Sequence, residues 1–493
     1  MRALAPCAAA LLVALVGGVA RPVTVATHGE LRQRYVVLSP FEVDAAGTPH
    51  GNRSRDELRL DVGGRFEISR QLWMRTMLQV LDGQILGDES PLEAGPGSRA
   101  WHNAGVRDDL FLREAVVQVP IGLGDVRVGR RAAYWGLGLA VHDGRTASTP
   151  FADARGGDIY NGILVDAVPM RAFAKGRAAE AVHLRLAFDV VERDELVDRT
   201  RGDLALRYSG SVMWEEPFVR AGVMLVHRSI DVDGGAQRSD TLFDVLFSLS
   251  RPLGRTLDLV VSAEAAALAG SVEEQAADGP TIRTTLRQFG ALARVALKAP
   301  ATGLEAALEL GAASGDSDPL DGTDTAFRFD PAYRVGMILF EEVLARTTAA
   351  ERRDLLAADD SIPRSRVDAY ATQGAVSNAL YLAPVVSFEA CSGCFIGNLG
   401  ALVAFSPTGV ASPSAALREV KNTNPYGGKA ASALLGWELN AGAALRVALP
   451  HTAAFSVGAQ YGFFSSGPAL DDVRGEPGPG LVHKWRVQAT ITW

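Results

Sequence analysis

The sequence predicts an all-β protein, a transmembrane antiparallel β-barrel of about eighteen strands, with about sixteen as the alternative count. Three observations predict this fold. Segments of alternating apolar and polar residues recur along the chain, and the connections between them alternate between long and short. No apolar run after the N-terminus reaches the roughly 18 residues that a membrane helix needs. Strands are therefore expected to be the elements that cross the membrane.

The alternation is clearest in the last segment, 481–493. Its odd positions are apolar except for His483, and its even positions from Lys484 onward are polar. A period of two places these sets on opposite faces of one strand, as in a barrel strand between lipid and a wet lumen. The edge strand of a β-sandwich gives the same pattern. In a barrel, Trp485 and Trp493 would anchor the strand at the membrane interface, and Trp493 would belong to the C-terminal signal that the barrel-assembly machinery reads.

The N-terminus predicts a secretory signal peptide over residues 1–20. A basic start is followed by an apolar run, and the small residues Gly18-Val19-Ala20 precede Arg21. A membrane anchor is the alternative, but the apolar run is short. Residues 21–493 are then expected to form one barrel domain in the outer membrane of a Gram-negative bacterium.

Each other strand is predicted from its own alternation; in 56–69, for example, Leu58 and Leu60 share one face while Arg59 and Asp61 share the other. The predicted strands cover 34–44, 56–69, 72–81, 112–119, 125–131, 159–168, 182–191, 203–214, 218–230, 240–250, 256–267, 282–297, 303–313, 376–389, 395–405, 432–449, 453–464 and 481–493.

The connections between these strands sort by parity. The even connections are mostly a few residues long, and the sixth, near 169–181, is somewhat longer. The odd connections are long and cover 44–56, 83–110, 132–157, 192–202, 231–239, 268–281, 314–375, 406–431 and 465–480. An outer-membrane barrel has long external loops, short periplasmic turns and both chain ends on the side of the turns. A sandwich or propeller has no reason to sort its connections in this way.

The longest connection, 314–375, is predicted to contain one or two helices between 337 and 357. A loop this long is usually functional or disordered. Its helix could fold into the lumen as a constriction, or it could pack on top as a cap. Four aspartates precede the helix in an acidic turn, at 316, 318, 321 and 324, but their spacing does not match the EF-hand pattern. A solvated acidic turn is the favoured interpretation.

After loss of the leader, two cysteines remain, Cys391 and Cys394, in Ala-Cys-Ser-Gly-Cys. Such a pair can be a redox centre, half of a zinc site or a small disulfide. A disulfide that closes a periplasmic turn is favoured, because an exported protein meets an oxidising compartment.

Charge and motifs narrow the function. The formal net charge is −8, which argues against nucleic acid as a partner. No G-x-S-x-G, H-E-x-x-H or Walker loop is present, so we expect no enzyme, no cofactor and no metal. Predicted lumen faces carry carboxylates together with basic side chains, namely Arg59, Arg65, Arg75, Arg127, Arg185, Arg207, Arg220, Arg294, Lys484 and Arg486. These charges could neutralise one another, or the arginines could guide anions past a constriction.

The stretch 125–144 contains Arg-x-Gly-Arg and then Trp-Gly-Leu-Gly at 135–138. It resembles a motif in an uncharacterised family of outer-membrane proteins from myxobacterium-like Gram-negative bacteria; 78–87 and 329–344 fit that pattern loosely. The general plan is also similar to eighteen-stranded alginate-export-type porins, which pass an anionic polysaccharide. Both resemblances imply an outer-membrane barrel, and neither supplies catalytic residues.

The favoured hypothesis is a porin-like channel for small hydrophilic or anionic solutes, with the 314–375 loop as plug or lid. Its expected partners are outer-membrane lipid, the barrel-assembly machinery and the solute, and its oligomeric state is not predicted. One alternative is a sealed structural or surface-interaction barrel without transport. Another is a barrel hydrolase.

Overall fold

A computed structural model describes residues 23–493, apart from 52, 70, 89–109, 154, 198, 200–201, 233–234, 276–280, 319–320, 359–366, 368–369, 420 and 451. The predicted signal peptide, 1–20, lies outside the described residues. No helix in the described ranges is long and apolar enough to cross a membrane.

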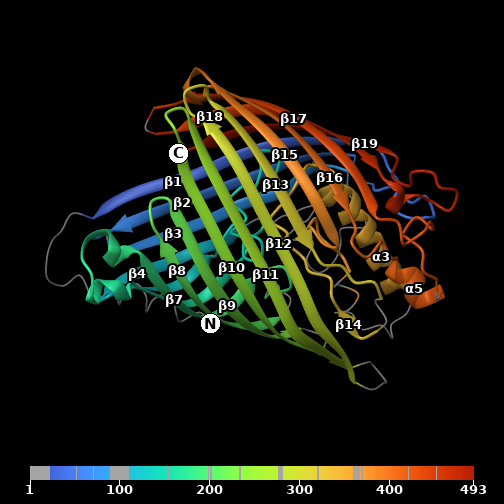
Figure 1. Ribbon diagram of the computed structural model, residues 1–493, viewed down its shortest axis with the longest axis horizontal. Coiled ribbons are helices and arrows are strands. Elements are labelled where there is room, and N and C mark those ends of the chain that lie inside the picture. Colours follow the sequence, from blue (N-terminus) through green and yellow to red (C-terminus); the bar gives the residue numbers. More distant parts are fainter. Residues whose placement is uncertain are drawn as a thin grey trace.

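In the part of the chain that the structure describes, nineteen strands belong to one sheet, and eighteen of them form the barrel wall (Figure 1). The wall strands are β1 (Thr24–Leu38), β2 (Ser54–Glu67), β3 (Trp73–Gly87), β4 (Phe111–Ile121), β5 (Gly124–Ala132), β6 (Ile159–Ala167), β7 (Val182–Arg193), β8 (Leu204–Glu215), β9 (Val219–Val232), β10 (Ala236–Leu253), β11 (Leu257–Gln275), β12 (Thr281–Ala299), β13 (Leu304–Ala313), β15 (Ala379–Ala390), β16 (Phe395–Phe405), β17 (Leu434–Ala448), β18 (Ala454–Ser466) and β19 (Leu481–Thr492). The remaining strand, β14 (Thr323–Asp324), pairs in parallel with β12 and belongs to the long connection after β13.

The first and last strands close the barrel. β1 pairs antiparallel with β2 and with β19, where Glu30 lies opposite Thr492. Beyond that rung, Gly29 and Trp493 exchange two backbone hydrogen bonds of 2.9 and 3.1 Å. Closure leaves no open sheet edge in lipid, where every backbone N–H and C=O must be paired. The predicted eighteen-stranded antiparallel barrel is confirmed.

Several predicted boundaries are wrong; the third strand, for example, was expected to end at 81 but continues to Gly87. The first strand was expected over 34–44, but β1 ends at Leu38, before Pro40, and begins ten residues earlier, where charged lumen-facing residues hid the pattern. The connections 231–239 and 268–281 were expected to be long loops. Instead β10, β11 and β12 extend to Ala236, Gln275 and Thr281, because polar residues also form β-ladders outside the lipid.

The parity of the connections is otherwise retained and defines two ends of the barrel. We call the end with the short connections the turn end and the other the loop end. Both ends of the barrel sheet lie at the turn end, since Thr24 pairs with Glu67, just before the β2–β3 turn, and Thr492 pairs with Ala454, just after the β17–β18 turn. In Figure 1 the C-terminus lies at the opposite end from the helices α3 (Ala345–Ala358) and α5 (Pro413–Glu419).

The two faces of the wall differ as the alternation predicts. On β8, Arg207 is 5% exposed and the next residue, Tyr208, is 48% exposed. Large apolar side chains such as Phe188 and Leu225 are likewise exposed on the outer face. An outward apolar band of this kind is the surface that a membrane barrel presents to lipid.

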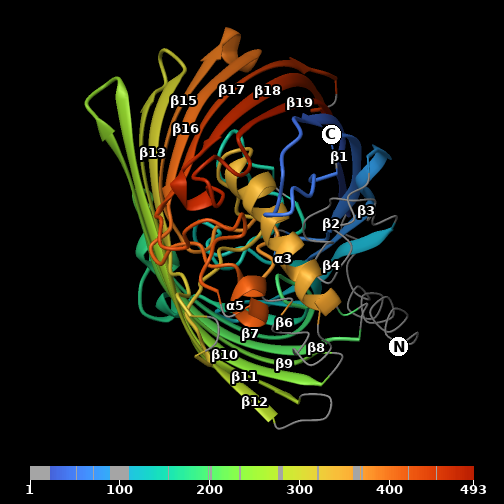
Figure 2. The ribbon, with the colours of Figure 1, turned by 90° about the vertical axis from the view of Figure 1, so that its right-hand side faces the viewer.

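Several of the described connections contribute residues to the buried core of the barrel, and two of them matter for the site. We call 133–158 the inner loop and 327–358 the plug segment. The plug segment contains a π-helical turn, η5 (Leu339–Leu344), followed directly by α3, in agreement with the predicted helix at 337–357. Figure 2 shows α3 within the ring of strands. Because η5 contacts wall residues of β2, β17 and β19, the segment lies inside the barrel at the loop end and is not an external cap.

Candidate solute-binding site in the lumen

The inner loop is fastened to the wall through the Trp-Gly-Leu-Gly motif. The Trp135 indole Nε1 donates to Asp244 of β10 over 2.7 Å, and the backbone N–H of Leu137 donates to the Glu264 carboxylate of β11. Gly136 has φ +61° and lies so close to Glu264 that a Cβ atom would overlap the carboxylate. The motif that carried the family resemblance is therefore an anchor for this loop.

The plug segment is fastened by Glu438 of β17. This buried carboxylate accepts backbone N–H groups of Met337, Ile338 and Leu339, the last two at 3.1 and 2.9 Å. These N–H groups lie at the start of η5 and have no acceptor within the helix. One wall carboxylate thus supplies the acceptors that this helix start needs, and it fixes where the helix begins.

A second carboxylate, Glu342 in η5, joins the plug segment to three cations. It accepts hydrogen bonds of 2.8 Å from Arg55 of β2 and from Arg346 of α3, and it lies 2.6 Å from the Lys484 ammonium of β19. Burial by itself raises the pKa of Glu342, but Arg55, Lys484 and Arg346 outweigh burial and hold that pKa well below its ordinary value. Glu342 is therefore a carboxylate throughout the physiological pH range.

Below this contact the lumen carries a group of guanidinium side chains, which we call the arginine cluster. Its members come from β1, β2, β19 and the inner loop: Arg32, Arg34, Arg55, Arg59, Arg145, Arg155 and Arg486. Asp153 of the inner loop lies at its centre, 2.6 Å from Arg34 and 3.7 Å from Arg32. Burial raises the pKa of Asp153, but Arg155, Arg34, Arg32 and Arg486 together hold it well below the ordinary value.

Arg145 is mostly buried and lies near other members of the cluster. Burial and the nearby charges of Arg59 and Arg32 lower the pKa of Arg145 to about 8, although Glu30 opposes them. Arg145 pairs with Asp61, yet its Nε has no hydrogen-bond partner in the part of the chain that the structure describes. The Nη1 atom of Arg55 is also buried and likewise has no hydrogen-bond partner among the described residues. Buried guanidinium N–H donors without a partner are groups with which a protein can bind an anion.

Three of the sequence-predicted lumen arginines reach this region. Arg59 binds Asp82 through two hydrogen bonds of 2.9 and 3.3 Å. Arg486 donates to the backbone carbonyl of Phe151 over 2.7 Å, and Arg294 donates to that of Ser148 over 3.0 Å, so both hold the inner loop. Lys484, the further basic residue of the last strand, binds the plug segment.

The other predicted arginines lie elsewhere on the wall. Arg65, Arg75, Arg127, Arg185 and Arg220 have carboxylate partners on their own or the adjacent strand, near the turn end. Arg207 binds Asp189, and its guanidinium lies 4.6 Å from the Tyr160 ring centroid. These six are ion-paired wall residues that the structure does not bring to the arginine cluster.

Five members of the cluster were not predicted. Arg34 begins the predicted first strand but was not assigned to the lumen, and Arg32 lies two residues before that strand. Both alternate with Leu31 and Tyr35, so a longer first strand would have shown the pattern. Arg55 lies one residue before the predicted second strand. Arg145 and Arg155 lie in a loop, where no periodicity marks a side chain that points into the lumen.

The predicted interface residues lie on the outer wall at opposite ends. Trp485 is exposed near the loop end, where its ring centroid lies 4.4 Å from that of Tyr461, and Trp493 follows β19 at the turn end.

Cys391 and Cys394 occupy the β15–β16 turn at the turn end and are thiols in this structure. The acidic turn uses Asp316, Asp321 and Asp324 as acceptors for backbone N–H groups two residues further on.

Comparison with known proteins gives a fold-level result. Neither the family models nor the curated proteins searched contain a match to this chain. Among solved structures, Pseudomonas aeruginosa OccK9 (OpdG) is similar with a TM-score of 0.53 at 9% identity, over 95% of this chain and 98% of that one. OccK1 (OpdK) of the same organism has a TM-score of 0.51 at 10% identity, over 95% and 99%. OpdK with vanillate has a TM-score of 0.50 at 10% identity, over the same shares.

These neighbours are outer-membrane porins with eighteen-stranded barrels. The chain therefore has the fold of an outer-membrane porin. Neither the myxobacterial-type family nor the alginate-export-type porins is among the families that these comparisons support.

Proposed function

We propose that this protein is an outer-membrane channel for small hydrophilic or anionic solutes, in which the arginine cluster attracts the solute below the plug segment. The observation that carries this proposal is the cluster itself. Arg32, Arg59 and Arg145 come from two strands and a loop, yet they lie near enough for the charges of Arg32 and Arg59 to act on Arg145. The solved neighbour with vanillate, a carboxylate, supports an anionic solute by analogy of fold.

The chemistry of arginine favours this role. A guanidinium presents several N–H groups in a plane that matches carboxylate and phosphate oxygens. Wall arginines can therefore replace the water that an anion leaves behind as it enters the lumen, as charged rings do in pores. Because the cluster also contains Asp153 and Asp61, we expect passage of the anion and not tight retention.

Planar lipid bilayers test the channel. We expect discrete conductance steps and, in a salt gradient, a reversal potential that indicates anion preference. The substitution Arg145→Gln should shift that potential toward cation preference. The matched control Arg171→Gln changes an exposed arginine at the turn end, paired with Glu180, and should leave the potential unchanged. A silent bilayer, together with liposomes that do not swell in sugars, would contradict a channel.

A sealed barrel is the second candidate, because Met337, Ile338 and Leu339 of the plug segment are completely buried against the wall. Deletion of 335–360 distinguishes the two. We expect conductance to rise when the segment is removed from a channel that it narrows. Conductance that stays at zero in a deletion variant that still inserts would favour a structural or surface-interaction barrel.

The remaining features of the proposal rest on the sequence. We propose cleavage after Ala20, a disulfide between Cys391 and Cys394, interface roles for Trp485 and Trp493, and no enzymatic activity. The disulfide is supported by the position of the two thiols, which lie three residues apart in one short turn. Kinship with the myxobacterial-type family rests on the motif at 135–138. The intact mass of protein purified from membranes tests the cleavage, and alkylation before and after reduction tests the disulfide.

A further inference from the structure

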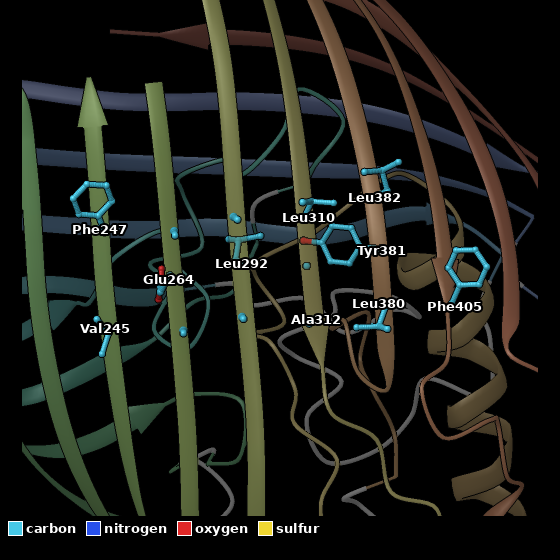
Figure 3. A pocket seen from close by; sticks show the side chains of 15 residues that line it. Val245, Phe247, Glu264, Leu292, Leu310, Ala312, Leu380, Tyr381, Leu382 and Phe405 are labelled. Carbon is cyan, nitrogen blue, oxygen red and sulfur yellow. The ribbon is translucent and has the colours of Figure 1, made fainter. Parts of the chain in front are cut away.

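A hollow of about 680 Å³ opens on the outer face of the barrel wall, over β10–β13, β15 and β16 (Figure 3). Its position on the outer face follows from its lining, because Phe247, Leu310 and Leu380 are 43–48% exposed, whereas lumen-facing residues of the same strands are buried. We call this hollow the outer basin.

The strand register builds the floor of the basin from alanine. Ala265 of β11 lies opposite Ala291 of β12, and two residues along, Ala263 lies opposite Ala293. Residues two apart on a strand share a face, so these four methyl groups form one block. Ala312 of β13, opposite Ala291, extends the block by one strand.

Larger side chains surround this floor. Val245 and Phe247 of β10 lie opposite Ala265 and Ala263 and form one side. The other side is formed by Leu310, Leu380, Leu382 and Phe405, as Figure 3 shows.

The two ends of the floor are also closed. Toward the loop end, Phe289 lies beside Ala267 in the next outward row. Toward the turn end, Val261 pairs with Val295 in the row beyond Ala263. The basin is therefore a depression bounded on four sides and not an open strip of small residues.

The basin lies toward the loop end of the membrane-facing wall. Ala312 is the last residue but one of β13, and Leu380 is the second residue of β15, so both lie next to the long connection that carries the plug segment. The leaflet that this part of the wall meets is the one on the side of the long loops.

We propose that the outer basin seats an acyl chain of a lipid in that leaflet. Its floor and rim are aliphatic or aromatic. The two lining residues with ionisable groups direct those groups away from the basin: the Glu264 carboxylate accepts from the inner loop, and the Tyr381 hydroxyl donates to Glu309. If the depression stayed empty, the side chains that line it and the lipid next to it would both lose dispersion contacts. A flexible methylene chain can enter the depression where a rigid surface cannot. The proposal needs membrane insertion but not transport.

The size of the basin argues against a second copy of the chain as the occupant. A stable protein interface takes about 20–30 residues from each side. The basin has 15 lining residues, some of which contribute from the lumen side of the strands. It is of the size of a small-molecule site, typically about 300–1,000 Å³.

Photolabelling tests this proposal in lipid nanodiscs that contain a phospholipid with a diazirine on its acyl chain. After illumination, labelled peptides are mapped by mass spectrometry. We expect labelling of 261–267, 289–295 and 380–386 at several times the level found on the outer face of β7 and β8. Equal labelling of all outward faces would overturn the proposal.

Variants make the test specific. Ala293→Phe fills the floor and should abolish the excess labelling, and Ala265→Leu on the neighbouring strand should do the same if the first variant does not fold. Ala306→Phe is the matched control, because Ala306 faces outward on β13 but does not line the basin, and it should retain the excess. An excess that survives filling of the floor contradicts an acyl-chain site. So does a chemically cross-linked dimer that Ala293→Phe abolishes.

Discussion

The Lys484 ammonium lies 2.6 Å from the Glu342 carboxylate, so the strand that closes the barrel is bound directly to the helix that fills its mouth. Arg55, on the next strand but one around the wall, donates to the same carboxylate. The plug segment is thus held by the strands on either side of the closing seam. Release of this contact is the simplest way to change the opening of the barrel.

Removal of the Glu342 charge should loosen the plug segment. In Glu342→Gln, Arg55, Arg346 and Lys484 lose a shared carboxylate, and loss of one partner of a buried ion pair costs about 3–5 kcal/mol. We expect single-channel conductance to rise severalfold while the barrel stays folded. The exposed carboxylate Glu180 gives the control, since Glu180→Gln should leave conductance unchanged. Wild-type conductance in Glu342→Gln would show that this contact does not hold the plug segment.

The contact between Glu342 and its three cations should persist at acidic pH. The pKa of Glu342 is held well below its ordinary value, so its contribution to stability is complete at neutral pH and is lost only as pH falls through that lowered value. We expect conductance to be constant from about pH 7, below the pKa of Arg145, to about pH 4.5, near the ordinary pKa of glutamate. Titration of conductance across this range checks it. A transition centred between pH 5 and 7 would contradict it.

The contact between the inner loop and Asp330 should weaken in base. Burial and the charge of Glu195 raise the pKa of Asp330 well above its ordinary value. Above the unfolded pKa the folded state holds a proton that the unfolded state has released, so the free energy of unfolding falls as pH rises. We expect faster hydrogen exchange in 133–158 at high pH than at pH 5, after correction for the intrinsic rate. Asp330→Asn keeps an acceptor for the His142 N–H and should flatten this dependence.

Gly136 should be intolerant of a side chain. In Gly136→Ala, left-handed backbone costs about 1–2 kcal/mol, and the added Cβ also overlaps the Glu264 carboxylate. Gly176→Ala is the matched control: φ is +70° there, but nothing lies within 4 Å of the added atom. We expect the unfolding temperature in detergent to fall more for Gly136→Ala than for Gly176→Ala. Equal decreases would mean that the Glu264 side chain can move away from the added Cβ without a cost in stability.

Truncation of 491–493 should prevent assembly. It removes the rung between Leu31 and Ile491 and both backbone hydrogen bonds between Gly29 and Trp493, which opens the seam at the turn end. An unpaired backbone in lipid is costly. We expect the truncated chain to be absent from the outer-membrane fraction and to lack the heat-dependent gel shift of a folded barrel. Normal insertion would show that these rungs are dispensable.

The sequence by itself determined the wall of this protein. Adjacent residues of a strand point to opposite faces. The polar Arg207 next to the apolar Tyr208 is therefore enough to assign the first side chain to the lumen and the second to lipid. The parity of the connections is equally local, and it placed both ends of the barrel at the turn end. The helix in the longest connection could also be read directly, because its apolar residues recur within one short stretch.

Only the tertiary structure decided which residues fill the inside of the barrel and what they contact. The hydrogen bond between Arg55 and Glu342 joins residues 287 positions apart, and no local pattern encodes such a contact. The arginine cluster depends in the same way on where the inner loop carries Arg145 and Arg155. The closing strand was predicted from alternation, with Lys484 as a lumen charge, but the carboxylate that this lysine meets was set by the folding of a distant loop into the barrel.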